Sequence, residues 1–407
     1  MGSRRITNKL GLLDVLRHAS FAGLVLRDLM VAPGHRRLHS TGEHLQAVMD
    51  WLCRAQDASV QGGMSSGYSW LDGWQGPYPE TTGYVIPTFL EFARVSGQTE
   101  FVERARRMAD WEIEIQLPSG AVRGGIGVNE YPIVFNTGQM ILGWTAMYRH
   151  GSDPKYLQAA RRAADWLVSV QDEDGKWSRH EYNSIPHAYH TRVAWPMLQV
   201  FALRGESAHR EAAVRNIEWV LSLVQENGWI REMAFKRTEW PYTHTIAYTL
   251  RGLHECARLL DGPIVSRIDA VVRRACETLL MKYECRKRDP RGAPEYLAGT
   301  FDDQWRPAAR YCCLTGCAQL AILFIKRFQL DGDPRLLNAA LKLIDQVRAT
   351  QSLRAINPGI RGAVAGSYPI WGGYIRYGYP NWAAKFLADA LMLSEQVLAR
   401  LRQEAAT

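Results

Sequence analysis

The chain has 407 residues, 47% of them hydrophobic and 22% charged, which is the composition of a soluble globular protein with a sizeable core. Its 49 lysines and arginines exceed its 41 aspartates and glutamates, and the net charge of +8 favours anionic partners such as acidic sugars or a lipid surface. The seven cysteines form neither a paired extracellular framework nor a CxxC metal pattern, so we expect reduced thiols.

Residues 1–40 are predicted to form a basic, amphipathic helical extension. Its apolar stretch, residues 10–31, is interrupted by Asp14, Arg17, His18, Arg27 and Asp28. It therefore predicts neither a bilayer span nor a signal-peptide core, and we expect a cytoplasmic protein. A basic amphipathic helix either packs against the fold or lies on an anionic membrane, so peripheral membrane contact is a second expectation.

From residue 41 onward the chain repeats itself about every 55 residues. Five apolar helical runs begin after a threonine, and a sixth begins near Asn381. The threonines are Thr82, Thr137, Thr191, Thr245 and Thr315. A short turn and a second helical run follow each of these apolar runs. Several of the second runs end in a Trp…Gln motif, as at Trp166 to Gln171. Six helical hairpins predict an all-α (α/α)6 toroid, a six-hairpin barrel, over residues 41–400. An open solenoid is the alternative.

The connections that lead into the Thr-headed helices are long, whereas those that leave them are short. All long segments should therefore lie on one face, around the N-termini of the inner helices, where loops on a rigid scaffold usually carry the site. The five threonines are expected to be N-caps.

Polar and aromatic residues concentrate in these long segments. Acid–base chemistry is assigned to the candidates His190, His244, Glu80, Tyr242, Tyr311, Tyr377 and Asp303. Substrate binding is assigned to Arg192, Arg376, Asn136, Trp74, Tyr78, Trp240, Trp305, Trp371, Tyr374 and Asn381, because aromatic faces stack on sugar rings and arginines hold carboxylates. His190 and His244 occupy equivalent repeat positions and are expected to face one cavity. No metal, cofactor or nucleic acid is expected.

Three chemistries are compatible with this set. Proton abstraction beside a uronate carboxylate needs a base, an acid and a cation. Hydrolysis needs two carboxylates, for which Glu80 with Asp303, or with Asp302, is the candidate pair. Isoprenoid chemistry is suggested by QDEDGKW at 171–177, which matches a word of squalene-cyclase-like and prenyltransferase-like toroids, although TFDDQW at 300–305 lacks the leading acid of the cyclases.

Three stretches, YPETTGYVIPT, QDEDGKW and NPGIRGAVAGSYPIWGGYIRYGYPNWAAKF, resemble bacterial toroid proteins that accompany glycosyltransferases in exopolysaccharide biosynthesis clusters and are sometimes labelled prenyltransferase-like. The resemblance covers most of residues 40–395. More distantly, the layout is similar to glucuronyl C5-epimerases and six-hairpin glycosidases, which implies carbohydrate chemistry. No catalytic residue is carried over from these families.

Together these observations predict a carbohydrate-active enzyme of polysaccharide synthesis or tailoring. Its expected substrate is an anionic, uronate-containing glycan, processed by proton abstraction as in a C5-epimerase or a lyase. His190 and His244 would act as base and acid, and Arg192 and Arg376 would hold the carboxylate. The alternatives are an inverting glycoside hydrolase, an isoprenoid cyclase and a non-catalytic glycan-binding scaffold.

Overall fold

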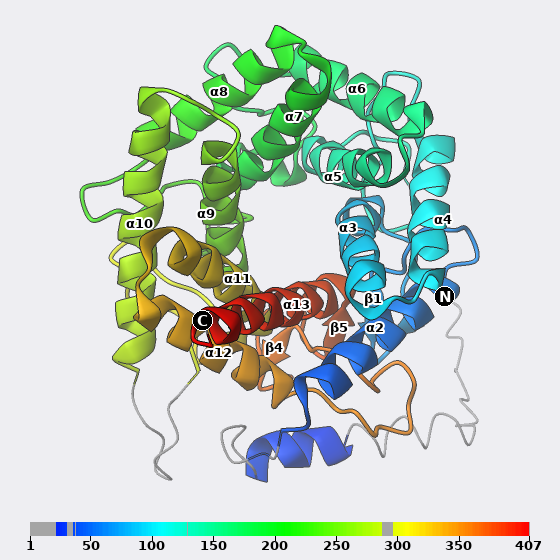
Figure 1. The fold of residues 1–407 in the computed structure, drawn as a ribbon, viewed down its shortest axis with the longest axis vertical. Coiled ribbons are helices and arrows are strands. Elements are labelled where there is room, and N and C mark those ends of the chain that lie inside the picture. The colour runs from blue at the N-terminus through cyan, green and yellow to red at the C-terminus, as the bar shows by residue number, and fades with distance from the viewer. Residues whose placement is uncertain (1–21, 31–35, 37, 128, 287–295, 407) are drawn as a thin grey trace, which may run out of the picture.

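A computed structural model describes residues 22–30, 36, 38–127, 129–286 and 296–406. Within these ranges, twelve long helices form two concentric rings (Figure 1). The inner ring consists of α3 (Pro79–Ser96), α5 (Val134–Gly151), α7 (Thr191–Arg204), α9 (Thr243–Ala257), α11 (Leu314–Asp331) and α13 (Asn381–Glu404). The outer ring consists of α2 (Thr41–Asp57), α4 (Glu100–Ile115), α6 (Pro154–Ser169), α8 (Ser207–Ser222), α10 (Pro263–Glu284) and α12 (Pro334–Arg348). A short helix over residues 22–30 lies outside the rings.

The inner ring is closed. Each inner helix packs against the next, and α13, the last, packs against both α3 and the first outer helix, α2 (Figure 1). The predicted (α/α)6 toroid is therefore confirmed, and the open solenoid is wrong. Short connections follow the inner helices, and long segments precede them, as the repeat predicts.

The two rings differ in how their helices are buried. Inner helix α11 is buried on nearly all sides, whereas outer helix α12 buries one stripe that includes Leu336, Leu343 and Val347. Small residues allow the inner helices to approach closely. A Cβ atom on Gly83 of α3 would lie 2.6 Å from the Cα atom of Met140 in α5.

The recurring glutamine joins neighbouring outer helices. The Nε2 group of Gln171, just after α6, donates to the carbonyl of Gly175 at 2.9 Å and to that of Ala212 in α8 at 2.8 Å. Gly175 has a φ of 89°, a left-handed conformation that favours glycine. The indole of Trp177 is fully buried and donates to the carbonyl of Leu167. The same bond to the next outer helix is made by Gln56 and Gln116. QDEDGKW is thus a structural joint in this chain.

The N-cap prediction for the threonines is wrong. The N-caps of α3, α5, α7, α9 and α11 are Tyr78, Ile133, His190, Tyr242 and Cys313. The Thr82 hydroxyl lies within the first turn of α3, where it donates to the Tyr78 carbonyl at 2.8 Å and accepts from the Met64 amide at 3.0 Å. It therefore fastens the preceding loop to the helix, and Thr137 does the same in α5.

Short strands connect the first and last long loops. Strand β1 (Gly67–Ser69) pairs with β2 (Gly73–Trp74) and with β5 (Gly378–Pro380), and β3 (Cys312–Cys313) pairs with β4 (Ser367–Tyr368). Two 3-10 turns, η2 (Tyr182–Ser184) and η3 (Ala188–His190), precede α7. All seven cysteines are free thiols, as expected.

The predicted division into an extension at 1–40 and a toroid at 41–400 stays a prediction, because residues 1–21 lie outside the described residues. None of the helices in the described ranges combines the length and the apolar character that a membrane crossing requires.

Candidate functional site

A cavity of about 420 Å³ lies where inner helices α3, α5 and α9 begin. Eight aromatic side chains dominate its wall, and among the described lining residues Glu80 is the only carboxylate and no lysine or arginine is present. The lining residues are Tyr78, Glu80, Gly125, Ile126, Phe135, Tyr182, Asn183, Tyr189, Phe235, His244, Tyr248, Tyr374, Ile375 and Trp382. Flat aromatic walls with a few polar groups suit ring-shaped ligands such as sugars.

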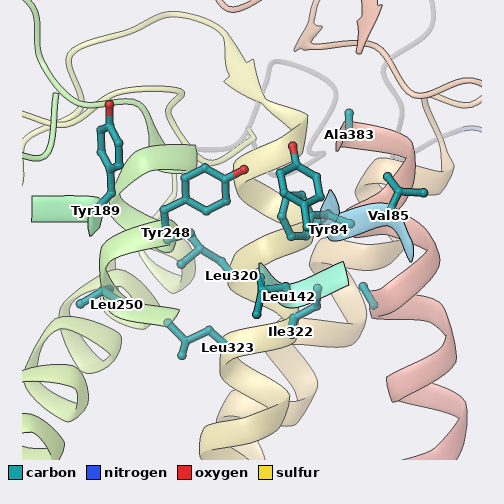
Figure 2. Close-up of a cluster of buried hydrophobic side chains, with 14 of the residues drawn as sticks. Tyr84, Val85, Leu142, Tyr189, Tyr248, Leu250, Leu320, Ile322, Leu323 and Ala383 are labelled. Atoms are coloured by element: carbon teal, nitrogen blue, oxygen red, sulfur yellow. The ribbon is translucent and has the colours of Figure 1, made fainter. Parts of the chain in front are cut away.

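Figure 2 shows how the inner helices present this wall. The hydroxyl ends of Tyr84 and Tyr189 point toward the long loops, and that of Tyr248 points toward Tyr84. Aliphatic side chains such as Leu320 and Leu323 lie below the tyrosine rings. All of these side chains are buried. The interior of the toroid is therefore packed with hydrocarbon beneath a polar, aromatic layer.

Glu80 is a titratable group of the cavity wall whose pKa is shifted toward neutrality by burial. It follows Pro79 in the first turn of α3 and is 8% exposed. Burial raises its pKa from 4.5 to about 7, although the hydrogen bond from Tyr78 and the charge of Arg192 oppose this rise. A carboxyl group with a pKa near neutrality exchanges protons readily under physiological conditions.

A row of hydroxyl groups leads away from Glu80. The Tyr78 hydroxyl contacts Glu80 Oε2, and it lies 2.7 Å from the Tyr182 hydroxyl, which donates to Asn136 Oδ1 at 3.1 Å. Asn136 Nδ2 donates to the Arg123 carbonyl at 2.9 Å, so its Oδ1 is the acceptor at the end of the row.

The number of protons in this row favours neutral Glu80. If Glu80 carries a proton, then Glu80 donates to Tyr78, Tyr78 donates to Tyr182 and Tyr182 donates to Asn136, so every contact is a hydrogen bond. If Glu80 is ionised, Tyr78 donates to it, and Tyr182 has one proton for two acceptors. Burial and the number of protons in the row therefore favour the protonated acid, whereas a hydrogen bond from Tyr78 and the charge of Arg192 favour the carboxylate, and with a pKa of about 7 both forms are populated at neutral pH.

His244 lines the same cavity from the first turn of α9. Its Nδ1 atom lies 3.2 Å from Gln319 Oε1, so Nδ1 carries the hydrogen and Nε2 keeps its lone pair. Burial is the main reason that the pKa of His244 falls to about 3. The charge of Arg192 lowers this pKa further, whereas the hydrogen bond to Gln319 raises it. At neutral pH the imidazole is uncharged, and its Nε2 atom can accept a hydrogen bond from a ligand.

The Tyr189 hydroxyl has no hydrogen-bond partner in the described residues, although the side chain is 1% exposed and lines the cavity. Its ring is fixed by stacking on His187, with centroids 4.5 Å apart, and by an edge contact to Phe135. A buried hydroxyl without a partner costs free energy unless a ligand satisfies it. It marks a place for a polar ligand atom.

His190 does not share the cavity with His244, contrary to the sequence-based expectation. Its fully buried ring lies between Trp177 and Phe135, and its Nε2 atom is 2.9 Å from Glu181 Oε2. Burial lowers the pKa of His190 to about 3 and raises that of Glu181 well above 4.5, so the pair is neutral. His190 ends the 3-10 turn η3, which directs its side chain behind the cavity wall.

Arg192 is buried behind the wall and does not line the cavity. Its guanidinium donates to Gln139 Oε1 at 3.1 and 2.9 Å and lies 4.8 Å from the centre of the Tyr248 ring. No carboxylate is among its hydrogen-bond partners in the described chain. Arg192 therefore acts on Glu80 and His244 through its charge and holds the wall residue Tyr248.

The expected carboxylate pair is not assembled. Asp302 uses its carboxylate to accept from the backbone amides of Gln304 and Arg306, and Asp303 lies beside it outside the cavity. Trp305 is buried against Trp229, and this contact stabilises the loop that carries Trp305. The structure therefore does not bring Asp303 into the cavity with Glu80, and the inverting-hydrolase alternative stays a prediction.

The remaining candidates divide between wall and scaffold. Tyr78 and Tyr374 line the cavity, and Asn136 ends the hydroxyl row. The residues that lie outside the cavity are Trp74, Trp240, Trp371, Tyr242, Tyr311, Arg376, Tyr377 and Asn381. Trp74 packs on Trp51, and Asn381 donates to Ser65 and Thr81, whereas Trp240 and Arg376 are exposed.

Sequence reasoning missed wall residues that sit within helices, chiefly Phe135, Tyr248 and Trp382. One signal was available for Tyr248. It follows His244 by four residues, so both side chains share one face of α9.

Residues 78–256, less than half of the chain, match the model of the squalene-hopene cyclase C-terminal domain. Among curated proteins, squalene–hopene cyclase from Bradyrhizobium diazoefficiens is 28% identical over 141 residues, which are 33% of this chain and 20% of that protein. Lanosterol synthase from Aspergillus fumigatus is 27% identical over 195 residues, 45% of this chain and 23% of that protein. The chain thus covers about a fifth of the length of these relatives. The matched range includes α3 to α9 and the structural QDEDGKW joint.

Solved structures with the same fold match over nearly their whole length. An unsaturated glucuronyl hydrolase specific for heparin superimposes with a TM-score of 0.67 at 12% identity, covering 88% of this chain and 98% of that chain. The unsaturated glucuronyl hydrolase from Bacillus sp. GL1 gives 0.65 at 14% identity, covering 86% and 96%. A sugar epimerase from a ruminal bacterium gives 0.65 at 11% identity, covering 86% and 97%. At these identities the likeness establishes the toroid fold of this chain.

Proposed function

We propose that this chain is a carbohydrate-active enzyme that transfers a proton at a sugar ring carbon, as an epimerase or a lyase does, with Glu80 as its proton-transfer group. The observation that carries this proposal is the Glu80 carboxyl, with a pKa of about 7, in a cavity walled by aromatic rings. The sugar-processing names of the full-length structural neighbours, glucuronyl hydrolase and sugar epimerase, support the substrate class.

Each polar group has a role in this proposal. Near neutral pH a large fraction of Glu80 is ionised and accepts a proton from a carbon next to a carbonyl or carboxyl group. The unpartnered Tyr189 hydroxyl donates to the oxygen on which negative charge develops. His244 Nε2 accepts a hydrogen bond from a sugar hydroxyl and so orients the ring. The Tyr78–Tyr182 row restores the hydrogen bonds when Glu80 takes up the proton.

The expected anionic substrate gains no support from the cavity wall. A uronate carboxylate needs a neutralising cation, and the described lining residues include neither lysine nor arginine. Arg192 lies behind Tyr248. We therefore favour a sugar whose reacting carbonyl or carboxyl group is uncharged. Membership of an exopolysaccharide assembly pathway stays a prediction.

The test is incubation of neutral and uronate-containing oligosaccharides in D₂O with the full chain, followed by NMR for deuterium on a ring carbon. We expect Glu80→Gln to reduce exchange by about 100-fold or more, the usual contribution of a general acid or base. Tyr189→Phe should weaken exchange, whereas Tyr156→Phe, which deletes a hydroxyl bound to Asp110 outside the cavity, should not. Full exchange in the Glu80→Gln variant would disprove the assignment. An ultraviolet-absorbing product would identify a lyase.

An isoprenoid cyclase is the second candidate, because the detectable sequence similarity is to squalene–hopene cyclase and lanosterol synthase. Aromatic walls also stabilise carbocations. Against it, TFDDQW lies outside the cavity, and the hydroxyl and imidazole groups of the wall have no use with a hydrocarbon. Conversion of squalene to a cyclic product, detected by mass spectrometry and lost in Glu80→Gln, would favour the cyclase. Glycan binding without turnover of either substrate would indicate the scaffold.

A further inference from the structure

A second cavity, of about 210 Å³, lies at the seam where the ring closes, between the start of α2 and the end of α12. Its polar wall is strongly basic, and among the described lining residues no carboxylate is present. The basic lining residues are Arg27, Arg36, His39, His44, Arg348 and Arg354. We refer to it as the seam pocket.

The positive charge of the seam pocket is only partly compensated. Asp28 lies 3.0 Å from Arg36 and 3.4 Å from Arg27, and Asp345 lies 2.7 Å from Arg348. Arg354 is exposed and forms no ion pair with the described part of the chain. Glu43 lies 3.2 Å from His39, so within the described residues four guanidinium and two imidazole groups face three carboxylates. Burial, and then the charge of Arg36, lower the pKa of Arg27, which means that its positive charge is costly there until an anion arrives.

His44 supplies an independent observation that points to a ligand. Its side chain is 2% exposed, its Nδ1 atom lies 2.6 Å from Gln351 Oε1, and its Nε2 atom is buried without a partner. Gln351 Nε2 donates to the Gly362 carbonyl, so Oε1 is the acceptor for His44. An anion in the seam pocket would favour a proton on Nε2 and accept a hydrogen bond from it.

The helix at residues 22–30 places apolar side chains next to this pocket. Arg27 donates to the Thr350 carbonyl at 3.0 Å, which fixes the helix beside the end of α12. Leu26, Leu29 and Met30 of the same helix are 54%, 63% and 63% exposed. The helix lies at the outer edge of the toroid (Figure 1).

We propose that the seam pocket binds the phosphate group of an anionic membrane lipid, while Leu26, Leu29 and Met30 enter the boundary between headgroups and acyl chains. A guanidinium group can donate two parallel hydrogen bonds to the oxygens of one phosphate. A helix that presents apolar and basic side chains together binds to the surface of an anionic bilayer. A soluble phosphate compound would use the same arginines but would gain nothing from the exposed leucines. The contact would bring the toroid to a membrane surface.

The test measures co-sedimentation of the full chain with phosphatidylglycerol-containing vesicles and with phosphatidylcholine vesicles. We expect binding to the first only. Arg354→Glu should weaken it about fivefold or more, since each basic residue near an anionic surface contributes about that factor. Arg107→Glu makes the same charge change at an exposed position of α4 and should have less than about a twofold effect. Unchanged urea midpoints would show that both variants are folded.

A second pair of measurements separates lipid from soluble phosphate. The double variant Leu26→Gln, Leu29→Gln should lose vesicle binding but keep the affinity of the wild type for inorganic pyrophosphate, measured by calorimetry. Equal losses in Arg354→Glu and Arg107→Glu would overturn the proposal, because binding would then reflect net charge alone. Pyrophosphate binding without vesicle binding, or neither, would also overturn it.

Discussion

The raised pKa of Glu80 makes a quantitative prediction about stability. In the unfolded chain this carboxyl should titrate near 4.5, and in the folded protein near 7. Between these values the native state binds more protons than the unfolded state, so stability must fall as pH rises. A difference of about 2.5 pKa units at about 1.4 kcal/mol each amounts to about 3.5 kcal/mol, lost between about pH 4.5 and pH 8.

Glu80→Gln tests this prediction, because the amide keeps the shape of the acid and does not ionise. Urea unfolding at pH 5, 6, 7 and 8 gives the free energy of unfolding of both proteins, and their difference cancels the other titrating groups. The variant should be close to the wild type at pH 5 and more stable by about 3.5 kcal/mol at pH 8. Glu211→Gln, on the exposed side of α8, is the control and should show no such trend. A pH-independent difference, or a wild type that gains relative stability at pH 8, would refute the reasoning about Glu80.

Five further variants, one of them a control, probe the same architecture. Tyr182→Phe removes the acceptor for Tyr78 in the protonated row and should lower the Glu80 pKa; a stability–pH curve unchanged from wild type would contradict the proton count. Gly83→Ala should cost at least about 2 kcal/mol in urea unfolding because its Cβ would lie 2.6 Å from the Met140 backbone, whereas Gly151→Ala, with open space, should be neutral or stabilising. Equal effects of the two would argue against the close α3–α5 contact. Gln171→Ala should lower the free energy of unfolding by about 1–3 kcal/mol, and Trp177→Ala should lower it by about 3–5 kcal/mol. Calorimetric melting unchanged from wild type in either case would mean that the QDEDGKW joint is not structural.

The QDEDGKW motif and the candidate site use different residues, although most of the cavity-lining residues also fall within the matched range 78–256. QDEDGKW lies at the joint between outer helices, where Gln171 and Trp177 bind backbone carbonyls. The cavity is formed by the first turns of inner helices and by the long loops. A scaffold joint of this kind can be kept while the cavity chemistry changes, which is why the matched domain does not decide the reaction.

The sequence by itself determined the ring. Six hairpins are specified by a period of about 55 residues, by alternating short and long connections and by two kinds of helix. These features can be recognised because the local hydrophobic periodicity indicates which face of a helix is buried. It also located Glu80, His244, Tyr78 and Tyr374 at the mouth. It could not show that a 3-10 turn directs His190 toward Glu181, or that Asp302 binds its own loop.

Only the tertiary structure decided which side chains meet. The row from Glu80 through Tyr182 to Asn136 joins segments up to about 100 residues apart, and the seam pocket joins the two ends of the toroid. Burial then set the protonation of Glu80 and His244. The physical reason is that desolvation and hydrogen-bond geometry depend on neighbours distant in sequence, whereas helix formation depends mainly on residues within a few positions.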